Sequence, residues 1–475
     1  MKRPAARPPK VMPSVYGPAP RTVRPADLPG MVSVGVTELF PEIERGYRQG
    51  EGVEEVYRAT IDALSRVNME RIRPGDTVNI LCSEHGFYIL EGLHYREMLK
   101  AIGDRVRAKT GCSNIRYRVA SGVGVREADE VVDHFGLKTY LNGNVTTTHP
   151  FDSSIAIDTE IGTLYGLAKI YDADWIIHAP HDEPRDLYFH RMMNRCLKAF
   201  AMNYARYETR AAFHGTFSNR SANFLQKAIF DSPLVQERFA FACILRSTPD
   251  GIVGADADDD LYRLDQRIAR DLLRDYGKVL RLIAEIDECI AVWDAGRWGY
   301  YIHAGGIAFG CLENGGYDAF DLTVPSAFGL HDLIQKYFSG EMKTFDRIMN
   351  INPAIKGVVI NQAWPGLPIS DVPRHVPTIV VGRDQTDMLN LDSTNPEFMK
   401  HAVTAESLET AMEFARKVSG TDKVIVFDGS FGNITASPSM AEDLIARAPA
   451  VSRVVEEKLL PMWLKQRGID PEAAQ

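Results

Sequence analysis

The densest group of chemically active side chains lies in the stretch 146–214. The chain has 12 histidines, and four of them fall within 37 residues: His178, His181, His190 and His214. Lys198 lies among them. Neutral imidazole serves as a general base, a general acid or a metal ligand near pH 7. Any one of these histidines is more often a core or surface residue, but the group together indicates a functional site.

Short β-rich runs and helical patterns alternate around this group. Strands are predicted at 76–83, 114–121, 174–179, 241–247, 288–295, 356–362, 378–383 and 423–429. Helices are predicted at 87–109, 125–135, 187–205, 259–285, 396–418 and 439–465. This alternation predicts an α/β protein with largely parallel sheets and crossover helices. Ligands bind beyond the carboxyl ends of parallel strands, and His178 and His181 fall at such an end.

The length of 475 residues favours more than one domain. We expect a Pro-rich, basic N-terminal arm at 1–30, a larger α/β domain at 31–295 and a smaller α/β domain at 296–475, with a cleft between the two domains. The hinge is expected near 291–305, where RWGYYIHAGG breaks the pattern. Eight prolines among the first 30 residues favour an extended arm.

Composition narrows the class of protein. The net charge of −9 argues against a nucleic-acid-binding surface, which needs a basic face. No run reaches the roughly 18 apolar residues of a membrane helix, and the N-terminus lacks the apolar core of a secretory signal. The six cysteines form no CxxC pair, which favours free thiols in a reducing cytoplasm.

The order of motifs in the stretch 146–214 resembles that of the lactate racemase-like family. The chain has HPFD at 149–152, a predicted strand at 174–179 and DEPRDLYF at 182–189. Lys198 follows, and His214 lies sixteen residues after Lys198, preceded by Tyr-Glu-Thr at 207–209. The match spans roughly 70–330 and makes the chain similar to a divergent member of that family.

The resemblance implies an isomerase that racemises or epimerises C2 of a 2-hydroxy acid by hydride transfer to a nickel-pincer nucleotide. It implies that Lys198 holds this cofactor covalently and that His214 completes nickel coordination. Proteins that synthesise the cofactor are then expected partners. Imidazole suits nickel, and desolvation can make a lysine amine nucleophilic. Inversion of C2 also needs a base on each side of the substrate and a cation for its carboxylate.

The chain departs from the family where catalytic residues are expected. Gly124 stands near the position of the first catalytic histidine, Arg185 replaces the second, and Phe328 falls near the position of a carboxylate-binding lysine. The glycine-rich stretch before the lysine is replaced by RMMNRCL.

If the catalytic group has been rebuilt, substitute residues must lie near these positions. The best substitute bases are His85, His181 and His190, and Arg126 and Arg185 are the candidate carboxylate binders. These polar replacements favour a sugar acid over lactate, and a mannonate or gluconate 2-epimerase is the preferred specific function.

Three alternatives stay open. An oxidoreductase on a doubly wound fold would need a GxGxxG fingerprint after a strand, and SGVGVRE at 121–127 matches it poorly. A divalent-metal hydrolase could use the cluster from His178 to His190, although its spacing matches no strong metal template. A non-catalytic relative that binds a sugar acid or the nucleotide would explain the missing catalytic residues.

Overall fold

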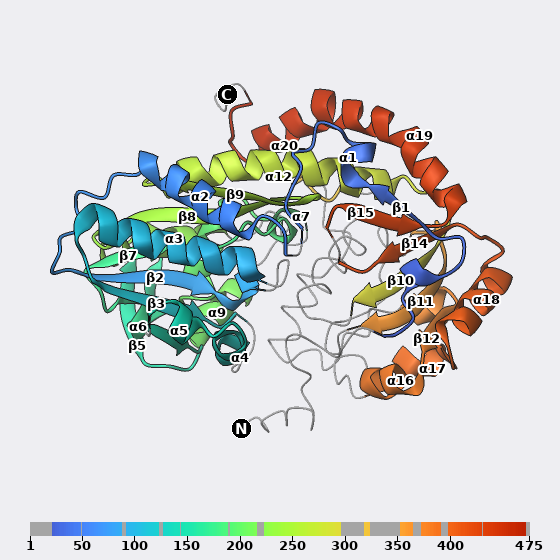
Figure 1. Ribbon diagram of the computed structural model, residues 1–475, viewed down its shortest axis with the longest axis horizontal. Helices are drawn as coiled ribbons and strands as arrows, with labels where there is room; N and C mark the ends of the chain where they lie inside the picture. The colour runs from blue at the N-terminus through green and yellow to red at the C-terminus, as the bar shows by residue number, and fades with distance from the viewer. Residues whose placement is uncertain are drawn as a thin grey trace.

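A computed structural model of the chain describes residues 21–48, 50–87, 92–122, 127–142, 144–188, 191–215, 223–295, 318–323, 352–363, 372–390, 398–429 and 431–471. It has a mixed α/β architecture with two sheets of mostly parallel strands (Figure 1). This confirms the predicted fold class. The predicted cleft between two domains stays a prediction.

The first sheet has the strand order β4-β3-β2-β7-β8-β9 within the described ranges. Its strands are β2 (Thr77–Ser83), β3 (Asn114–Ala120), β4 (Val145–Thr148), β7 (Trp175–His178), β8 (Phe239–Thr248) and β9 (Gly251–Asp258). All neighbours pair in parallel except β8 and β9. Six of the seven residues of β2 are buried, as expected for a parallel strand covered on both faces. A separate hairpin is formed by β5 (Ser154–Thr159) and β6 (Gly162–Leu167).

The second sheet has the order β1-β15-β14-β10-β11-β12-β13. Its strands are β1 (Val32–Gly35), β10 (Cys289–Ala295), β11 (Ile355–Ala363), β12 (Thr378–Val381), β13 (Val403–Ala405), β14 (Val424–Phe427) and β15 (Asn433–Ala436). The two sheets therefore do not divide the chain at the predicted boundary between 295 and 296. Both β1 and β10 precede that boundary and pair in the second sheet.

Helices cover both sheets. The longer ones are α2 (Val53–Ala63), α3 (Leu93–Thr110), α4 (Glu127–His134), α9 (Tyr207–Gly215), α10 (Asn223–Phe230), α12 (Leu261–Ala284), α16 (Arg383–Asn390), α18 (Leu408–Ser419) and α19 (Pro438–Val454). Short helices are α1 (Val36–Leu39), α5 (Leu137–Tyr140), α6 (Ala168–Tyr171), α7 (Arg185–Tyr188), α8 (Lys198–Ala201), α11 (Pro233–Gln236), α15 (Val372–His375), α17 (Phe398–His401) and α20 (Leu460–Gln466). No helix within these described ranges is long and apolar enough to span a membrane.

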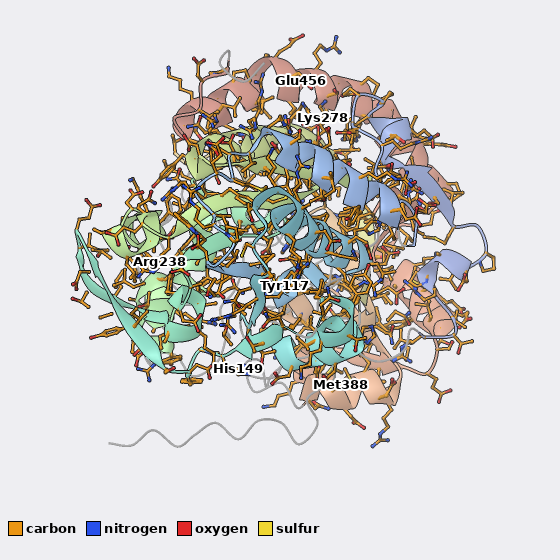
Figure 2. The ribbon with its side chains drawn as sticks, turned by 60° about the vertical axis from the view of Figure 1, so that its left-hand side comes forward. Tyr117, His149, Arg238, Lys278, Met388 and Glu456 are labelled. Atoms are coloured by element: carbon orange, nitrogen blue, oxygen red, sulfur yellow. The ribbon has the colours of Figure 1, made fainter. Side chains whose placement is uncertain are left out.

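Helix α12 joins the two halves of the molecule. It begins at Leu261 because Asp260 accepts hydrogen bonds from the backbone N–H groups of Tyr262 and Arg263, as an N-cap does. Its buried face belongs to one continuous apolar cluster that contains residues of both sheets. The buried Lys278 of α12 lies 2.6 Å from Glu42 and 2.6 Å from Glu456 (Figure 2). These pairs connect the beginning, the middle and the end of the chain.

The strand predictions agree better with the structure than two of the helix predictions. The stretch 187–205 is not one helix: α7 ends at Tyr188, and the backbone of Arg191 has φ +53°. The predicted helix 396–418 is also wrong, because β13 (Val403–Ala405) separates α17 from α18. The predicted hinge at 291–305 lies partly outside the described residues. The five described cysteines are free and buried, whereas Cys311 lies outside the described residues.

Candidate functional site

The candidate site lies where the strand order of the first sheet changes direction. The chain passes from β2 to β3 and β4 on one side, and then returns to place β7 on the other side of β2. Ligands bind at such a switch point, beyond the carboxyl ends of the strands. Ser83 and His178 are the last residues of β2 and β7. The polar residues that follow these two strands therefore come together.

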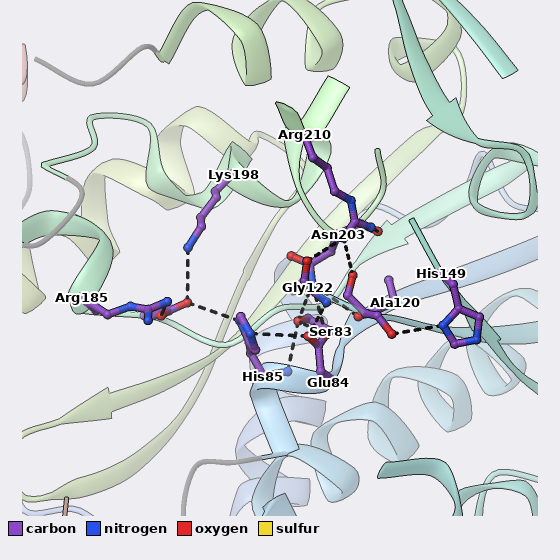
Figure 3. Close-up of polar contacts among 12 residues, drawn as sticks. Ser83, Glu84, His85, Ala120, Gly122, His149, Arg185, Lys198, Asn203 and Arg210 are labelled. Atoms are coloured by element: carbon purple, nitrogen blue, oxygen red, sulfur yellow. Dashed lines mark hydrogen bonds and ion pairs between the residues drawn. The ribbon is translucent and has the colours of Figure 1, made fainter. Parts of the chain in front are cut away.

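His85 lies between two acidic side chains at this edge (Figure 3). Its Nε2 is 3.5 Å from Oε1 of Glu84, and its Nδ1 is 3.9 Å from Oε2 of Glu183. Burial lowers the pKa of His85 to about 3, although Glu183 acts in the opposite direction. His85 is therefore a neutral imidazole near pH 7.

Glu84 is fully buried and accepts hydrogen bonds from three donors: the last residue of β2, the segment after β3 and the segment between α8 and α9. The Gly122 backbone N–H donates to its Oε1, while the Ser83 hydroxyl (3.0 Å) and the Asn203 amide (3.3 Å) donate to its Oε2. Burial and the nearby Glu127 raise the pKa of Glu84 to about 8. A Cβ at Gly122 would lie 2.7 Å from Oε1 of Glu84, so a larger residue here would displace that carboxyl group.

Arg210 of α9 holds the backbone around this network. Its guanidinium donates to the carbonyls of Ser121 (2.9 Å), Gly122 (2.6 Å), Asn203 (3.1 Å) and Ala205 (2.8 Å). These contacts join α9 to the carboxyl end of β3, and they position both Gly122 and Asn203 against Glu84.

Lys198 extends the same group from the other side. Its Nζ lies 2.6 Å from Oδ1 of Asp186 and 3.7 Å from Oε2 of Glu183. We call Glu84, His85, Glu183, Lys198 and Asp186 the polar row. Burial acts to raise the pKa of Glu183, but Arg185 and Lys198 hold that pKa well below its usual range.

Arg185 joins the polar row through Glu183. Its guanidinium lies 2.5 Å from Oε1 of Glu183, and both side chains are mostly buried. Among the described residues, the buried Nε of Arg185 has no hydrogen-bond partner. One edge of this guanidinium is therefore left to donate to a ligand.

His181 lies at the same edge of the sheet and is buried, with 8% of its surface exposed. It is part of the isolated bridge to Leu245, and its ring meets Tyr95 edge-on, 6.4 Å between centroids. Burial lowers its pKa to about 4. Its Nδ1 has no hydrogen-bond partner within the described part of the chain. A buried ring nitrogen without a partner costs free energy unless a ligand or water binds it.

His178 differs from His181, because both of its ring nitrogens are bonded within the protein. Nδ1 lies 2.9 Å from the Tyr204 hydroxyl, and Nε2 lies 2.8 Å from the Cys196 carbonyl. The carbonyl can only accept, so Nε2 carries the proton. His178 therefore connects β7 to the segment around Cys196, which disfavours it as a metal ligand.

The other predicted site residues are only partly described. His190 and Arg126 lie outside the described residues, and so do Gly124 and Phe328. His214 lies on α9, but its side chain is outside the described set. In the ranges that the structure describes, no three His, Cys, Asp or Glu side chains are grouped as a metal site requires. The structure thus brings together His85, His181, Arg185 and Lys198 of the predicted residues.

The motifs that carry the family resemblance contact one another. Phe151 of HPFD stacks on Tyr207, with ring centroids 5.1 Å apart, and the Tyr207 backbone N–H donates to the Pro150 carbonyl. The Thr209 hydroxyl accepts a hydrogen bond of 2.8 Å from the backbone N–H of Tyr165. The Tyr-Glu-Thr run therefore anchors the start of α9. The chain matches no protein-family model and no curated protein.

Five residues of this arrangement were not predicted: Glu84, Glu183, Asp186, Asn203 and Arg210. Glu84 directly precedes His85, and Glu183 follows His181 by two positions. An acidic residue next to a histidine at a strand end was therefore an available signal. Nothing in the sequence pattern marks Asn203 or Arg210, because the contacts that join them to the ends of β2 and β3 are with residues more than 80 positions away.

Proposed function

We propose that this protein is a racemase or epimerase that acts at C2 of a 2-hydroxy acid, preferably a sugar acid. The observation that carries the proposal is the buried His181 Nδ1, which has no partner among the described residues, at the same sheet edge as His85. Two imidazoles with strongly lowered pKa values are present as neutral bases near pH 7. A reaction that must proceed in both directions across one carbon needs one base on each face of the substrate.

His85 and His181 have distinct roles in this proposal. Each accepts the hydroxyl proton of one substrate enantiomer and returns a proton when the other enantiomer reacts. The ionised neighbour of His85, Glu183, stabilises the imidazolium that forms when His85 takes the proton. The free Nε edge of Arg185 donates to the substrate carboxylate.

Lys198 fits the attachment of the cofactor that the family resemblance implies. Its amine belongs to the polar row, and only 12% of its side chain is exposed, so a group joined to it is screened from water. His214, on α9, is the matching nickel ligand. When bound, a nickel-pincer nucleotide supplies the hydride acceptor and donor that inversion of C2 requires.

A second candidate is a non-catalytic relative that binds the acid without converting it. One observation favours it: Lys198 lies within ion-pair distance of two carboxylates, Asp186 and Glu183. An amine held in an ion pair is not free to act as a nucleophile. Cofactor attachment would require these contacts to be exchanged.

Cofactor loading and turnover separate the two candidates. The full chain is purified from cells that also make nickel-pincer nucleotide, as wild type, Lys198→Ala and the control Lys169→Ala, whose lysine is half-exposed. Intact mass and nickel content are measured for each. Inversion of 2-deuterated lactate, mannonate and gluconate is then followed by chiral chromatography and mass spectrometry.

We expect a mass increase with bound nickel in the wild type and in Lys169→Ala, but not in Lys198→Ala. We also expect inversion with the deuterium retained, as hydride return requires. Inversion with loss of deuterium would contradict the hydride mechanism. Binding of an acid without inversion in loaded protein would establish the non-catalytic candidate instead.

A further inference from the structure

The second sheet has its own switch point, and a segment of the N-terminal arm lies across it. The chain passes from β10 to β11, β12 and β13 on one side and returns to place β14 on the other side of β10. The segment Arg21–Leu28, which we call the strap, contacts the carboxyl ends of these strands. Its Leu28 is buried in the apolar cluster of this sheet, so one end of the strap is fixed.

Arg24 of the strap is bound at the end of β10. Its Nε lies 2.5 Å from Oδ2 of Asp294, whose side chain is almost fully buried. The side-chain amide of Asn361, on β11, donates to the other oxygen of Asp294 at 2.8 Å. The turn Pro25–Asp27 fixes the approach of Arg24, because the Asp27 carboxylate accepts from the Arg24 backbone N–H at 3.1 Å.

Arg21 is bound by the ends of the next two strands. Its guanidinium donates to the carbonyls of Asn361 (2.8 Å) and Val381 (2.7 Å) and to the carboxylate of Asp384 (2.9 Å). Gly382 has φ +78°, and a Cβ there would lie 2.9 Å from this guanidinium. The absence of a side chain at Gly382 thus makes room for Arg21.

Among the described residues, the groups that bind the two guanidinium groups and the Arg21 backbone N–H are all hydrogen-bond acceptors. They are two carboxylates, two backbone carbonyls and the side-chain oxygen of Gln362, which accepts at 3.4 Å from the Arg21 backbone N–H. The buried side-chain oxygen of Asn361 is a further acceptor, and within the described ranges it has no partner. Such a set binds a planar guanidinium and rejects an anion.

We propose that the carboxyl edge of the second sheet is a guanidinium-binding site, filled by Arg21 and Arg24 of the chain itself, and that the strap closes this edge by occupying the site. The strand topology places this site where a doubly wound sheet binds its ligand. Opening of the strap exposes the buried Asp294 and Asn361 and frees the already exposed Asp384, so that all three can bind a cationic ligand such as an arginine side chain. The inference does not depend on the proposed racemase activity.

Trypsin tests the strap, since it cleaves the bond between Arg21 and Thr22 only when the strap opens, whereas the bond after Arg24 precedes Pro25 and resists trypsin. The wild type is compared with Asp294→Asn and with Asp62→Asn, a matched change at an exposed aspartate. We expect Asp294→Asn to raise the initial rate of cleavage after Arg21 about tenfold, because Arg24 loses its carboxylate partner, and Asp62→Asn to leave that rate unchanged. Equal cleavage rates of the wild type and Asp294→Asn would contradict the proposal that Asp294 holds the strap closed.

Chemical rescue tests the guanidinium site and does not need the Asp294 variant to fold. The thermal midpoint of Arg24→Ala is measured with millimolar methylguanidinium or tetramethylammonium, beside Arg58→Ala, which removes an exposed arginine. We expect methylguanidinium alone to raise the midpoint, and only in Arg24→Ala. The guanidinium site would be contradicted if methylguanidinium raised the thermal midpoints of both variants equally. It would also be contradicted if both cations raised the midpoint of Arg24→Ala equally.

Discussion

At the scale of single residues, burial decides which histidines of the first sheet are available as bases. His178 and His181 both have strongly lowered pKa values because of burial. They differ in their hydrogen bonds, since Tyr204 and the Cys196 carbonyl occupy His178, whereas His181 Nδ1 is free of any partner among the described residues. His181 is therefore neutral near pH 7 and has a ring nitrogen that no described group occupies. These two properties make it the histidine best able to accept a proton from a ligand.

The lowered pKa of His181 predicts a pH-dependent stability. Its folded pKa of about 4 lies below the ordinary value of 6.5, so the unfolded chain binds the extra proton between these pH values. Stability must therefore fall as the pH drops through this window. Between pH 7 and pH 4.5, the free energy of unfolding should fall in both proteins. We expect the fall to be about 2 kcal/mol smaller in His181→Gln than in the wild type. Urea unfolding at the two pH values measures this difference.

The matched control is His375→Gln, because His375 is exposed in the folded protein as it is in the unfolded chain. This variant should show the same loss between pH 7 and pH 4.5 as the wild type. An equal loss in wild type and His181→Gln would mean that His181 is not a buried neutral imidazole, and the proposed base would then be wrong.

At the scale of elements, α9 determines the shape of the candidate site. Arg210 is buried, and burial lowers its pKa to about 10. Its guanidinium satisfies four carbonyls at the ends of β3 and around Asn203. We expect Arg210→Met to lower the free energy of unfolding by about 3 kcal/mol, since hydrogen bonds from a charged donor are lost and buried carbonyls remain without donors.

Arg206→Met is the control for this change. Arg206 lies one turn before Arg210, is about one third exposed and pairs only loosely with Glu208, at 3.4 Å. Removing it should cost no more than about 1 kcal/mol, the usual limit for a surface ion pair. Similar losses in the two variants would show that Arg210 does not hold α9 against the sheet.

Elements that are defined by local patterns were predicted well from the sequence. The strand prediction 114–121 and the observed β3 (Asn114–Ala120) nearly coincide, because Ile115, Tyr117 and Val119 recur at every second position, which is the period of a strand. The helix 259–285 was predicted for the same kind of reason, from an apolar stripe that α12 buries. The stretch 187–205 failed, since apolar spacing does not reveal a residue such as Arg191 with positive φ.

The candidate site was predictable only where residues follow strand ends. His85 and His181 could be placed together, because the carboxyl ends of neighbouring parallel strands meet at one edge. The contact of Lys198 with Glu183 and Asp186 could not, since it depends on the irregular path between α7 and α8. Contacts from a side chain to distant backbone, such as those of Arg210, leave no periodic trace in the sequence.

At the scale of the whole molecule, the carboxyl ends of both sheets face the centre (Figure 1). The first sheet presents the polar row there, and the second presents the strap with Arg21 and Arg24. One apolar cluster, centred on α12, spans both sheets. The two halves therefore share an apolar core.

Lys278 tests whether these distant parts of the chain stabilise one another. Its side chain is 0% exposed, whereas those of its partners Glu42 and Glu456 are 40% and 41% exposed. Lys278→Met removes a buried charge and leaves two carboxylates that water can solvate, so we expect a loss of about 1 kcal/mol.

The double variant Glu42→Gln, Glu456→Gln instead leaves the buried ammonium without a counter-charge. It should cost about 3 kcal/mol, clearly more than Lys278→Met. Urea unfolding of the wild type, Lys278→Met and the double variant measures which change lowers the free energy of unfolding more. If Lys278→Met proved the more damaging change, the ion pairs would be surface contacts of little weight, and the apolar cluster around α12 alone would hold the two halves together.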